Sequence, residues 1–210
     1  IHEVMGRHCG WLTAATALED RNRLENFNFI PEIGLRREKW EVHSIFIPEK
    51  EIDFDSECER LNKIMDKYDC VNVFLSEGAG LETIVKETEK EGGKVLRDAF
   101  GHVRLDDLNP GQWFAKKLAE KLNANKVLVQ KSGYFGRSSK SNKKDLDLIF
   151  AVADKAVESA VNKISGVVGW DEDDNNNLNC IDFNRIKGGK PFDITQEWYT
   201  NMMNEIHDIK

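Results

Sequence analysis

Short β-rich runs alternate with amphipathic segments of helical period along most of this chain. The runs predict strands at residues 42–47, 71–75, 94–96 and 126–130. Apolar residues three and four positions apart predict a helix capped by Asp55 and further helices near residues 81–91, 110–122 and 144–163. Strands that alternate with helices pair in parallel, because each helix carries the chain back across the sheet. The sequence therefore predicts an α/β fold with a largely parallel sheet.

The helix expected at residues 144–163 has the clearest apolar stripe. Its apolar residues follow steps of three, one, three, four, three and one positions, the spacing of one helix face: Leu146, Ile149, Phe150, Ala153, Val157, Ala160 and Val161. Short strands are expected after it, at residues 167–168 and 181–183. We expect an α/β domain over residues 1–165 and a C-terminal segment, residues 166–210, that packs back on the α/β core.

Two stretches interrupt this alternation. Residues 19–41 are polar and irregular, and we expect them to form a surface excursion. Residues 171–179 (DEDDNNNLN) are acidic and rich in asparagine. A solvated turn is the main interpretation of this second stretch, and a metal site is the alternative.

Composition and charge exclude several classes of protein. Of 210 residues, 40% are hydrophobic and 32% are charged, as in soluble globular proteins. The net charge of −7 argues against nucleic acid as the main partner, and no apolar run approaches the roughly 18 residues that cross a bilayer. The four cysteines form no CxxC pair, so free thiols in a reducing cytoplasm are expected. The chain begins at Ile1 with a motif close behind, which indicates a piece of a longer protein.

Cationic residues stand beside glycines where the expected strands end. Ligands bind beyond the carboxyl ends of the strands in open α/β sheets. The cations there and in the opening segment MGRHCGW are Arg7, Arg97, Arg104, Lys131 and Arg137. A guanidinium pairs with two phosphate oxygens, glycines let backbone N–H groups approach an anion, and Glu77 suits sugar hydroxyls. The pattern indicates a sugar-phosphate pocket; the alternative is scattered surface arginines and loop glycines.

Three other catalytic motifs fail on spacing. His2 and His8 suggest the zinc motif HExxH, but they lie six positions apart rather than four and so do not share a helix face. No GK[ST] follows SEGAG at residues 76–80, so that segment is not a P-loop. No GxSxG nucleophile elbow occurs in SGYFGRS at residues 132–138.

Six segments, in order, resemble the motifs of phosphofructokinases. They are EVMGRHCGWLTAATA at 3–17, IFIPE at 45–49, VFLSEGAG at 73–80, DAFGHVRLDDLNPGQWFA at 98–115, KVLVQKSGYFGRSS at 126–139 and GGKPFD at 188–193. The resemblance covers nearly the whole chain, and several ordered motifs are far more specific than one. It implies a phosphofructokinase-like fold, which is a Rossmann-like three-layer domain with a mainly parallel sheet.

Two segments resemble the pyrophosphate-dependent branch of that family. Bacterial ATP enzymes have GHIQRGG where this chain has GHVRLDD, and QKSGYFGRS resembles the pyrophosphate branch. The Tyr-x-x-Arg unit of that branch contacts substrate and falls on Tyr134, Phe135, Gly136 and Arg137. The implied reaction is reversible, glycolytic phosphoryl transfer from pyrophosphate to the 1-hydroxyl of fructose 6-phosphate. An ATP-dependent phosphofructokinase and a non-catalytic, sugar-phosphate-binding regulatory subunit are the alternatives.

The resemblance implies roles for residues near the first two strand ends. Met5, Gly6 and Arg7 would line the sugar phosphate, with Arg7 near the transferring group, and Glu77 would accept hydrogen bonds from fructose hydroxyls. Simpler roles are open for three of them. Met5 and Gly6 would serve helix packing, and Glu77 would cap the helix that begins at Leu81.

Four further residues receive implied roles. Tyr134 and Arg137 would bind the 6-phosphate, although Tyr134 would alternatively close the pocket wall. His102 would lie close to the same phosphate. Arg97 would reach the site of a neighbouring subunit, as a family arginine near this place does.

The resemblance places the remaining catalytic parts outside these 210 residues. The family carries its catalytic aspartate in a Thr-x-Asp-Asn-Asp motif and its phosphoryl-donor loop in a Gly-Gly-Asp motif, both upstream of MGR, and neither occurs here. Mg²⁺ would be held mainly by that missing part. We therefore expect no kinase activity from this chain alone. The parent enzyme would be a cytoplasmic homo-oligomer with no membrane partner.

Overall fold

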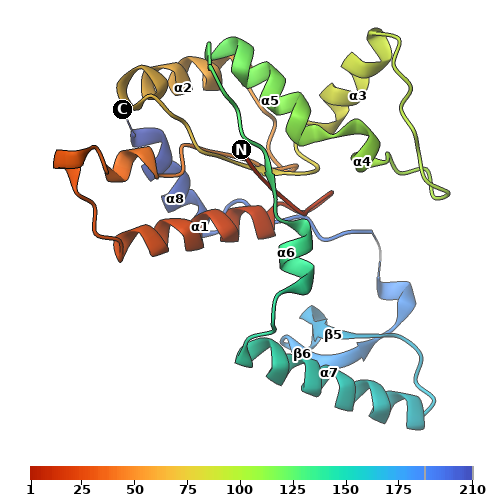
Figure 1. Cartoon of the computed structure of the whole chain (residues 1–210). Helices are drawn as coiled ribbons and strands as arrows, with labels where there is room; N and C mark the ends of the chain where they lie inside the picture. The colour runs from red at the N-terminus through yellow and green to blue at the C-terminus, as the bar shows by residue number, and fades with distance from the viewer. Residues whose placement is uncertain (187, 210) are drawn as a thin grey trace. The chain divides into compact units, whose positions relative to one another are not determined.

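The computed structural model describes residues 1–186 and 188–209 (Figure 1). Contacts between residues group the chain into two compact units. The first unit consists of Ile1–Tyr134 and the segment from Lys190 onward, and the second is Phe135–Gly189. The expected division into residues 1–165 and 166–210 stays a prediction.

A four-stranded sheet forms the centre of the first unit. Its strands are β1 (His2–Val4), β2 (Ser44–Phe46), β3 (Val73–Ser76) and β4 (Gln130–Lys131). The order is β2-β3-β1-β4, so β1 and β3 are the two inner strands. All three neighbouring pairs run parallel, which confirms the predicted parallel α/β sheet.

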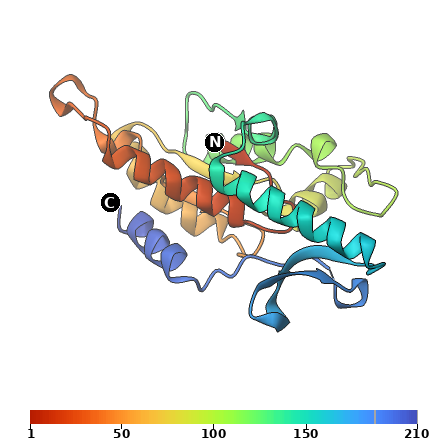
Figure 2. The same cartoon turned by 90° about the horizontal axis from the view of Figure 1, so that it is seen from below.

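Two helices cover one face of this sheet. They are α1 (Trp11–Glu25) and α8 (Glu197–Asp208), which lie side by side in Figure 2. An ion pair of 2.8 Å between Arg21 Nη2 and Glu205 Oε2 joins them. Apolar side chains of both helices, among them Ala14 and Met202, form one core cluster with Phe74 of β3.

The opposite face is covered by α2 (Phe54–Tyr68), α3 (Leu81–Lys90) and α5 (Pro110–Lys121), with the short α4 (Leu105–Leu108) before α5. Their apolar residues form a second core cluster with Val73 and Leu75 of β3. Helices on both faces of one sheet make three layers, which confirms the expected three-layer domain (Figure 1).

The division between the two clusters follows from the geometry of β3. Successive strand side chains point to opposite faces, so Phe74 belongs to one cluster while Val73 and Leu75 belong to the other. A parallel strand that is buried on both faces is apolar throughout. This explains why the sequence around β3 shows a continuous hydrophobic run instead of an alternation.

Two predictions about strands need correction, and one strand was not predicted. No strand forms at residues 94–96, which follow two glycines, stay largely exposed and reach only an isolated bridge between Arg97 and Val103. β4 begins at Gln130, so only the last residue of the predicted run 126–130 is a strand residue. Conversely, the sequence does not predict the inner strand β1, because its three residues, HEV, include two polar side chains.

Two predictions about helices are also wrong. The N-cap of α2 is Asp53, whose carboxylate accepts the Ser56 N–H at 3.1 Å, and Asp55 lies within the first turn. α1 continues to Glu25, so residues 19–25 are helical, and the rest of the polar stretch contains the 3-10 turns Pro31–Ile33 and Arg37–Lys39. The predicted helix starts at Leu81 and Pro110 are confirmed.

None of the helices in the described part of the chain is long and apolar enough to span a bilayer.

The second unit consists of one long helix and a hairpin. α6 (Gly133–Ser138) crosses the boundary between the units, and α7 (Lys143–Val161) follows. The hairpin is formed by the antiparallel strands β5 (Val167–Asp171) and β6 (Asn177–Ile181). The predicted stripe of α7 is not covered by this hairpin, since Phe150 is 64% exposed and Val161 is 75% exposed.

The acidic stretch at residues 171–179 contains the turn of the hairpin, at residues 172–176, and the strand ends on either side of it. Asp171 is buried and accepts from Arg185 Nη1 at 2.8 Å, and this guanidinium lowers the pKa of Asp171 to about 2. Asn175 and Asn176 adopt positive φ at the tip, a conformation that asparagine tolerates. Across residues 1–186 and 188–209, no group of three His, Cys, Asp or Glu side chains is arranged to hold a metal.

We expect buried His43 to make the stability of the first unit depend on pH. Its Nδ1 accepts the Asn72 N–H at 2.8 Å, so Nε2 carries the proton and donates to the Glu38 carbonyl at 2.9 Å. Burial is the main cause that lowers the pKa of His43. The unfolded chain then binds more protons below about pH 6.5, so the free energy of unfolding should fall as the pH drops below that value.

Urea unfolding at pH 7.5 and pH 5.5 measures this effect. The wild-type chain should lose stability at the lower pH, and His43→Gln should lose less. Equal losses in the two proteins would show that His43 does not titrate on unfolding in this range.

Candidate functional site

The carboxyl ends of β1 and β3 bring two predicted segments together. Val4 pairs with Ser76 in the parallel register, and the Glu77 N–H donates to the Val4 carbonyl at 3.0 Å. Residues 5–10, here called the Arg7 loop, leave β1 at this point, and residues 77–80, the Glu77 loop, leave β3. Two inner, adjacent strands therefore deliver Arg7 and Glu77 to the same edge of the sheet.

Gly6 is held by hydrogen bonds from both sides. Its N–H donates to Glu77 Oε1 at 3.2 Å, and its carbonyl accepts from Ser76 Oγ at 2.5 Å. Its φ of +150° is a conformation that favours glycine, and an added Cβ would lie 2.4 Å from the Cys9 carbonyl oxygen. The Arg7 loop thus needs glycine at this position and is attached to the Glu77 loop.

Gly78 allows the two loops to touch. A Cβ at Gly78 would lie 1.9 Å from the carbonyl oxygen of Arg7 and 2.9 Å from its Cα. A side chain cannot be accommodated there unless the backbone moves. The backbone of Arg7 therefore packs directly against Gly78 of the Glu77 loop.

The capping role considered for Glu77 is wrong. α3 has Gly80 as its N-cap and receives no side-chain capping bond. The Glu77 carboxylate points instead to the Arg7 loop, where Oε1 accepts from Gly6. The role of Glu77 toward a sugar hydroxyl stays a prediction.

β4 brings a third predicted segment beside β1. The Ser132 N–H donates to the Glu3 carbonyl at 3.0 Å, which extends the ladder beyond Lys131. A Cβ at Gly133 would lie 3.3 Å from Met5 Cγ, so these two residues touch. The start of the Tyr-x-x-Arg unit is thereby placed next to Met5. Tyr134 itself is 82% exposed.

The rest of the Tyr-x-x-Arg unit belongs to the second unit of the structure. The boundary falls after Tyr134, so Phe135, Gly136 and Arg137 lie beyond it. α6 includes all four residues, and Tyr134 and Arg137 are one helical turn apart on it. That Arg137 joins Arg7 and Glu77 around one ligand stays a prediction.

His102 approaches the Arg7 loop from a compact turn. Asp98 Oδ1 accepts the N–H groups of Phe100 and His102, each at 2.9 Å, and the centroid of the His102 ring lies 6.0 Å from that of His8. Arg97 Nη1 donates to the Gly101 carbonyl of the same turn at 3.0 Å. The structure thus brings His102 close to His8 of the Arg7 loop, while the role of Arg97 toward a second subunit stays a prediction.

An ion pair between buried Glu3 and exposed Lys131 was not predicted. Glu3 of β1 is 7% exposed, and its Oε1 lies 3.3 Å from Lys131 Nζ. Lys131 also donates to Asn109 Oδ1 at 2.9 Å, and Gly111 leaves the space that Glu3 Oε2 occupies. The sequence does show a charged residue, Glu3, two positions before MGR. It indicates a buried carboxylate only once β1 is known to be an inner strand.

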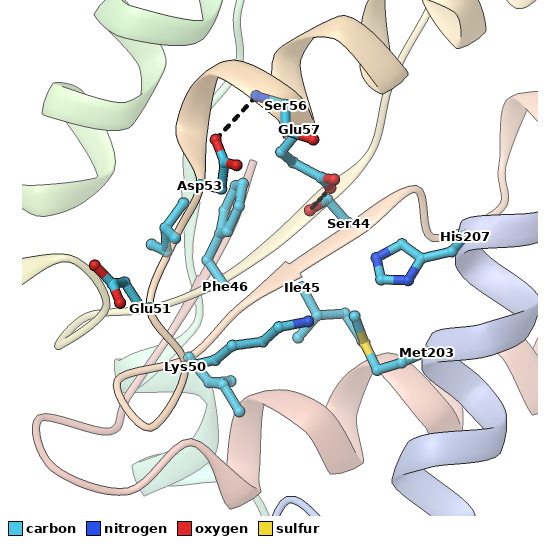
Figure 3. Close-up of a pocket in the computed structure, with 12 residues that line it drawn as sticks. Ser44, Ile45, Phe46, Lys50, Glu51, Asp53, Ser56, Glu57, Met203 and His207 are labelled. Carbon is cyan, nitrogen blue, oxygen red and sulfur yellow. Dashed lines mark hydrogen bonds between the residues drawn. The ribbon is translucent and has the colours of Figure 1, made fainter.

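A separate hollow of about 160 Å³ lies on the outer side of β2 (Figure 3). It is lined by residues of β2, of the loop between β2 and α2, of the start of α2 and of α8, among them Lys50, Met203 and His207. Polar groups on its wall pair with one another, as Ser44 Oγ donates to Glu57 Oε1 at 2.6 Å. None of the predicted site residues lines this hollow. The structure therefore gives no reason to move the candidate site there.

Curated relatives match the chain along its whole length. It is 56% identical over 210 residues to a pyrophosphate–fructose 6-phosphate 1-phosphotransferase of Methylomonas methanica, and the match covers 100% of this chain and 51% of that protein. A protein of the same name from Mastigamoeba balamuthi is 48% identical over 210 residues, with the same coverage. The chain thus spans about half the length of the curated relatives it matches. No family model matches the chain.

A solved structure shares the fold. The pyrophosphate-dependent phosphofructokinase from Nitrosospira multiformis superposes with a TM-score of 0.53 at 20% identity, over 98% of this chain and 46% of that one. At this identity the likeness concerns the fold alone. It agrees with the parallel three-layer architecture of the first unit. The sequence similarity along the full length of the chain groups it with pyrophosphate–fructose 6-phosphate 1-phosphotransferases, of which it spans about half.

Proposed function

We propose that the chain supplies the fructose 6-phosphate-binding part of a pyrophosphate-dependent 6-phosphofructokinase. The reaction transfers a phosphoryl group from pyrophosphate to the 1-hydroxyl of fructose 6-phosphate, reversibly, in glycolysis. One observation carries this proposal. The Arg7 and Glu77 loops leave adjacent parallel strands and contact each other through Gly6 and Gly78, in a chain that matches phosphotransferases of this name from end to end.

The two loops supply complementary chemistry. Arg7 is a fixed positive charge that would stabilise negative charge on the phosphoryl group during transfer. Glu77 is an acceptor, and since Oε1 is already bonded to Gly6, we assign the other oxygen to a fructose hydroxyl. Met5 and Gly6 would form the wall beside the sugar phosphate. A cation next to an acceptor at a strand edge suits a phosphorylated sugar.

The 6-phosphate would be bound by the Tyr-x-x-Arg unit. Tyr134 and Arg137 stand one turn apart on α6, with Phe135 and Gly136 between them. A guanidinium and a phenol on one side of a helix donate hydrogen bonds to different phosphate oxygens. His102 would add a donor to the same phosphate, and Arg97 would act on a second copy of the protein.

The remaining components are assigned to the part of the protein outside this chain. No cluster of carboxylates, His or Cys in residues 1–186 and 188–209 fits a metal ion, so no step involving Mg²⁺ is assigned to these residues. The aspartate that would deprotonate the 1-hydroxyl would come from the same missing part. A homo-oligomeric, cytoplasmic enzyme completes the proposal.

Substitution of Arg137 tests the phosphate pocket. In the product of the complete gene, Arg137→Ala should raise the KM for fructose 6-phosphate roughly 100-fold, because a bidentate charge-assisted contact contributes about 2–3 kcal/mol. The kcat should change less, since the 6-phosphate does not react. Steady-state kinetics with varied fructose 6-phosphate measures both constants. The control is Arg36→Ala at an exposed site, and an unchanged KM in Arg137→Ala would remove Arg137 from the pocket.

Assays with two phosphoryl donors test the function as a whole. The product of the complete gene should form fructose 1,6-bisphosphate with pyrophosphate, and the 210-residue chain alone should not. Turnover with ATP only would identify an ATP-dependent enzyme. Binding of fructose 6-phosphate without turnover with either donor would identify a regulatory subunit.

A further inference from the structure

Three of the family-like segments meet at one carboxylate. Glu49, the last residue of IFIPE, accepts the Gly10 N–H at 2.9 Å through Oε1 and at 3.0 Å through Oε2. Its Oε1 also accepts the Phe192 N–H at 2.8 Å. Gly10 belongs to the MGRHCGW segment and Phe192 to GGKPFD, which lie 39 and 143 positions from Glu49. None of the roles assigned above uses Glu49.

Glu49 supplies a carboxylate at the N-terminus of α1, where it accepts the N–H of the N-cap residue Gly10. Gly10 is the N-cap residue of this helix and has no side chain to cap it. A carboxylate at that end satisfies a backbone N–H group and interacts favourably with the helix dipole. Gly10 in turn makes room, because a Cβ there would lie 2.7 Å from Glu49 Oε2 and 2.4 Å from Ile47 Cβ. The fit between the two residues is therefore mutual.

The Arg7 loop is thereby attached at both ends. Its start is held at Gly6 by Ser76 and Glu77, and its end is held at Gly10 by Glu49. Arg7 lies between the two attachments. If the loop were attached at one end only, the Arg7 guanidinium would be free to move. Two attachments restrict the position of the Arg7 backbone.

The Glu49 carboxylate also binds the GGKPFD segment, through Phe192. Phe192 is buried against Trp198 and Tyr199, with ring centroids 5.5 Å and 5.1 Å away. The Phe192 N–H reaches Glu49 from this cluster. The end of the Arg7 loop is thus fixed to the core under α8.

We propose that Glu49 is a positioning residue that holds Arg7 in place for phosphoryl transfer, without touching substrate. This inference rests on the proposed function. Hydrogen bonds to an ionised carboxylate are about twice as strong as neutral ones. Small displacements of a group that acts on the transition state reduce the rate strongly, by roughly 100-fold for 1 Å.

The test uses Glu49→Gln in the product of the complete gene, with Glu51→Gln as the matched control. Glu51 is an exposed residue two positions away, on the wall of the hollow in Figure 3. Glutamine keeps the shape of Glu49 but has one acceptor oxygen and no charge. Glu49→Gln should lower kcat roughly 10- to 100-fold with a smaller change in the KM for fructose 6-phosphate. Glu51→Gln should match wild type.

Amide hydrogen exchange provides a second readout in the same proteins. The Gly10 and Phe192 N–H groups should exchange faster in Glu49→Gln, while the strand amides of β1 and β3 keep wild-type rates. That pattern, together with the lowered kcat, supports positioning. A wild-type kcat in the folded variant overturns it, and so does a fall in activity that only follows a fall in the folded fraction. If wild type makes no fructose 1,6-bisphosphate, the proposed function fails first, and the catalytic role of Glu49 falls with it.

Discussion

Arg7→Ala should lower the kcat of the product of the complete gene by roughly 10²- to 10³-fold. This is the loss seen when one preorganised group that stabilises transition-state charge is removed. The backbone of Arg7 is seated on Gly78 and lies between the attachments at Gly6 and Gly10. Because that scaffold consists of backbone and neighbouring groups, removal of the guanidinium should leave the loop in place. The defect should therefore appear in kcat more than in the KM for fructose 6-phosphate.

Steady-state kinetics with pyrophosphate and fructose 6-phosphate measures this effect. Arg23→Ala is the matched control, since Arg23 is an exposed arginine of α1 that pairs with Asp20 at 3.0 Å. It should keep wild-type kinetics. If Arg7→Ala raised KM alone and kept kcat, Arg7 would be a binding group and its assignment to the transferring phosphoryl would be wrong.

The second large effect is expected for Gly78→Ala. The new Cβ would lie 1.9 Å from the Arg7 carbonyl oxygen, and the atoms it meets are backbone atoms. A flexible side chain could rotate away, but here one of the two loops must shift. We expect a loss of about 3 kcal/mol in the free energy of unfolding, at the upper end for overpacked sites. Activity should fall with it, because Arg7 is carried on the loop that moves.

Urea unfolding followed by tryptophan fluorescence gives the stability of Gly78→Ala. The control is Gly189→Ala, since a Cβ at Gly189 meets no atom within 4 Å, and its stability should stay within about 0.5 kcal/mol of wild type. Equal stabilities of Gly78→Ala and wild type would mean that the close approach of the two loops is not required. The attachment of Arg7 to the Glu77 loop would then have to be abandoned.

Local sequence signals identified several elements correctly. Gly80 in a left-handed conformation precedes α3, and Pro110 opens α5, so both helix starts were readable from single residues. The continuous apolar run around β3 indicated a strand that is buried on both faces. In each case the residue type restricts the backbone or the burial of its own position, without regard to distant segments.

The candidate site was only partly predictable. Arg7, Glu77 and His102 were expected together, and the structure places Glu77 against the Arg7 loop and the ring of His102 beside that of His8. The inner strand β1 was missed, since HEV has no apolar alternation. Without that strand, the ion pair of Glu3 with Lys131 could not be predicted.

The sequence alone indicated the resemblance to phosphofructokinases, the parallel α/β architecture and the chemical character of the strand ends. Motifs and hydrophobic periodicity are patterns of residue types at short spacing, so they can be recognised in the sequence itself. Only the tertiary structure decided that β1 is an inner strand, that Gly78 touches Arg7, and that Glu49 joins segments 39 and 143 positions away. Such contacts form between segments that are far apart in the sequence and that the sheet brings together. The propensity of a residue reflects only its near neighbours in the sequence, so it cannot predict them.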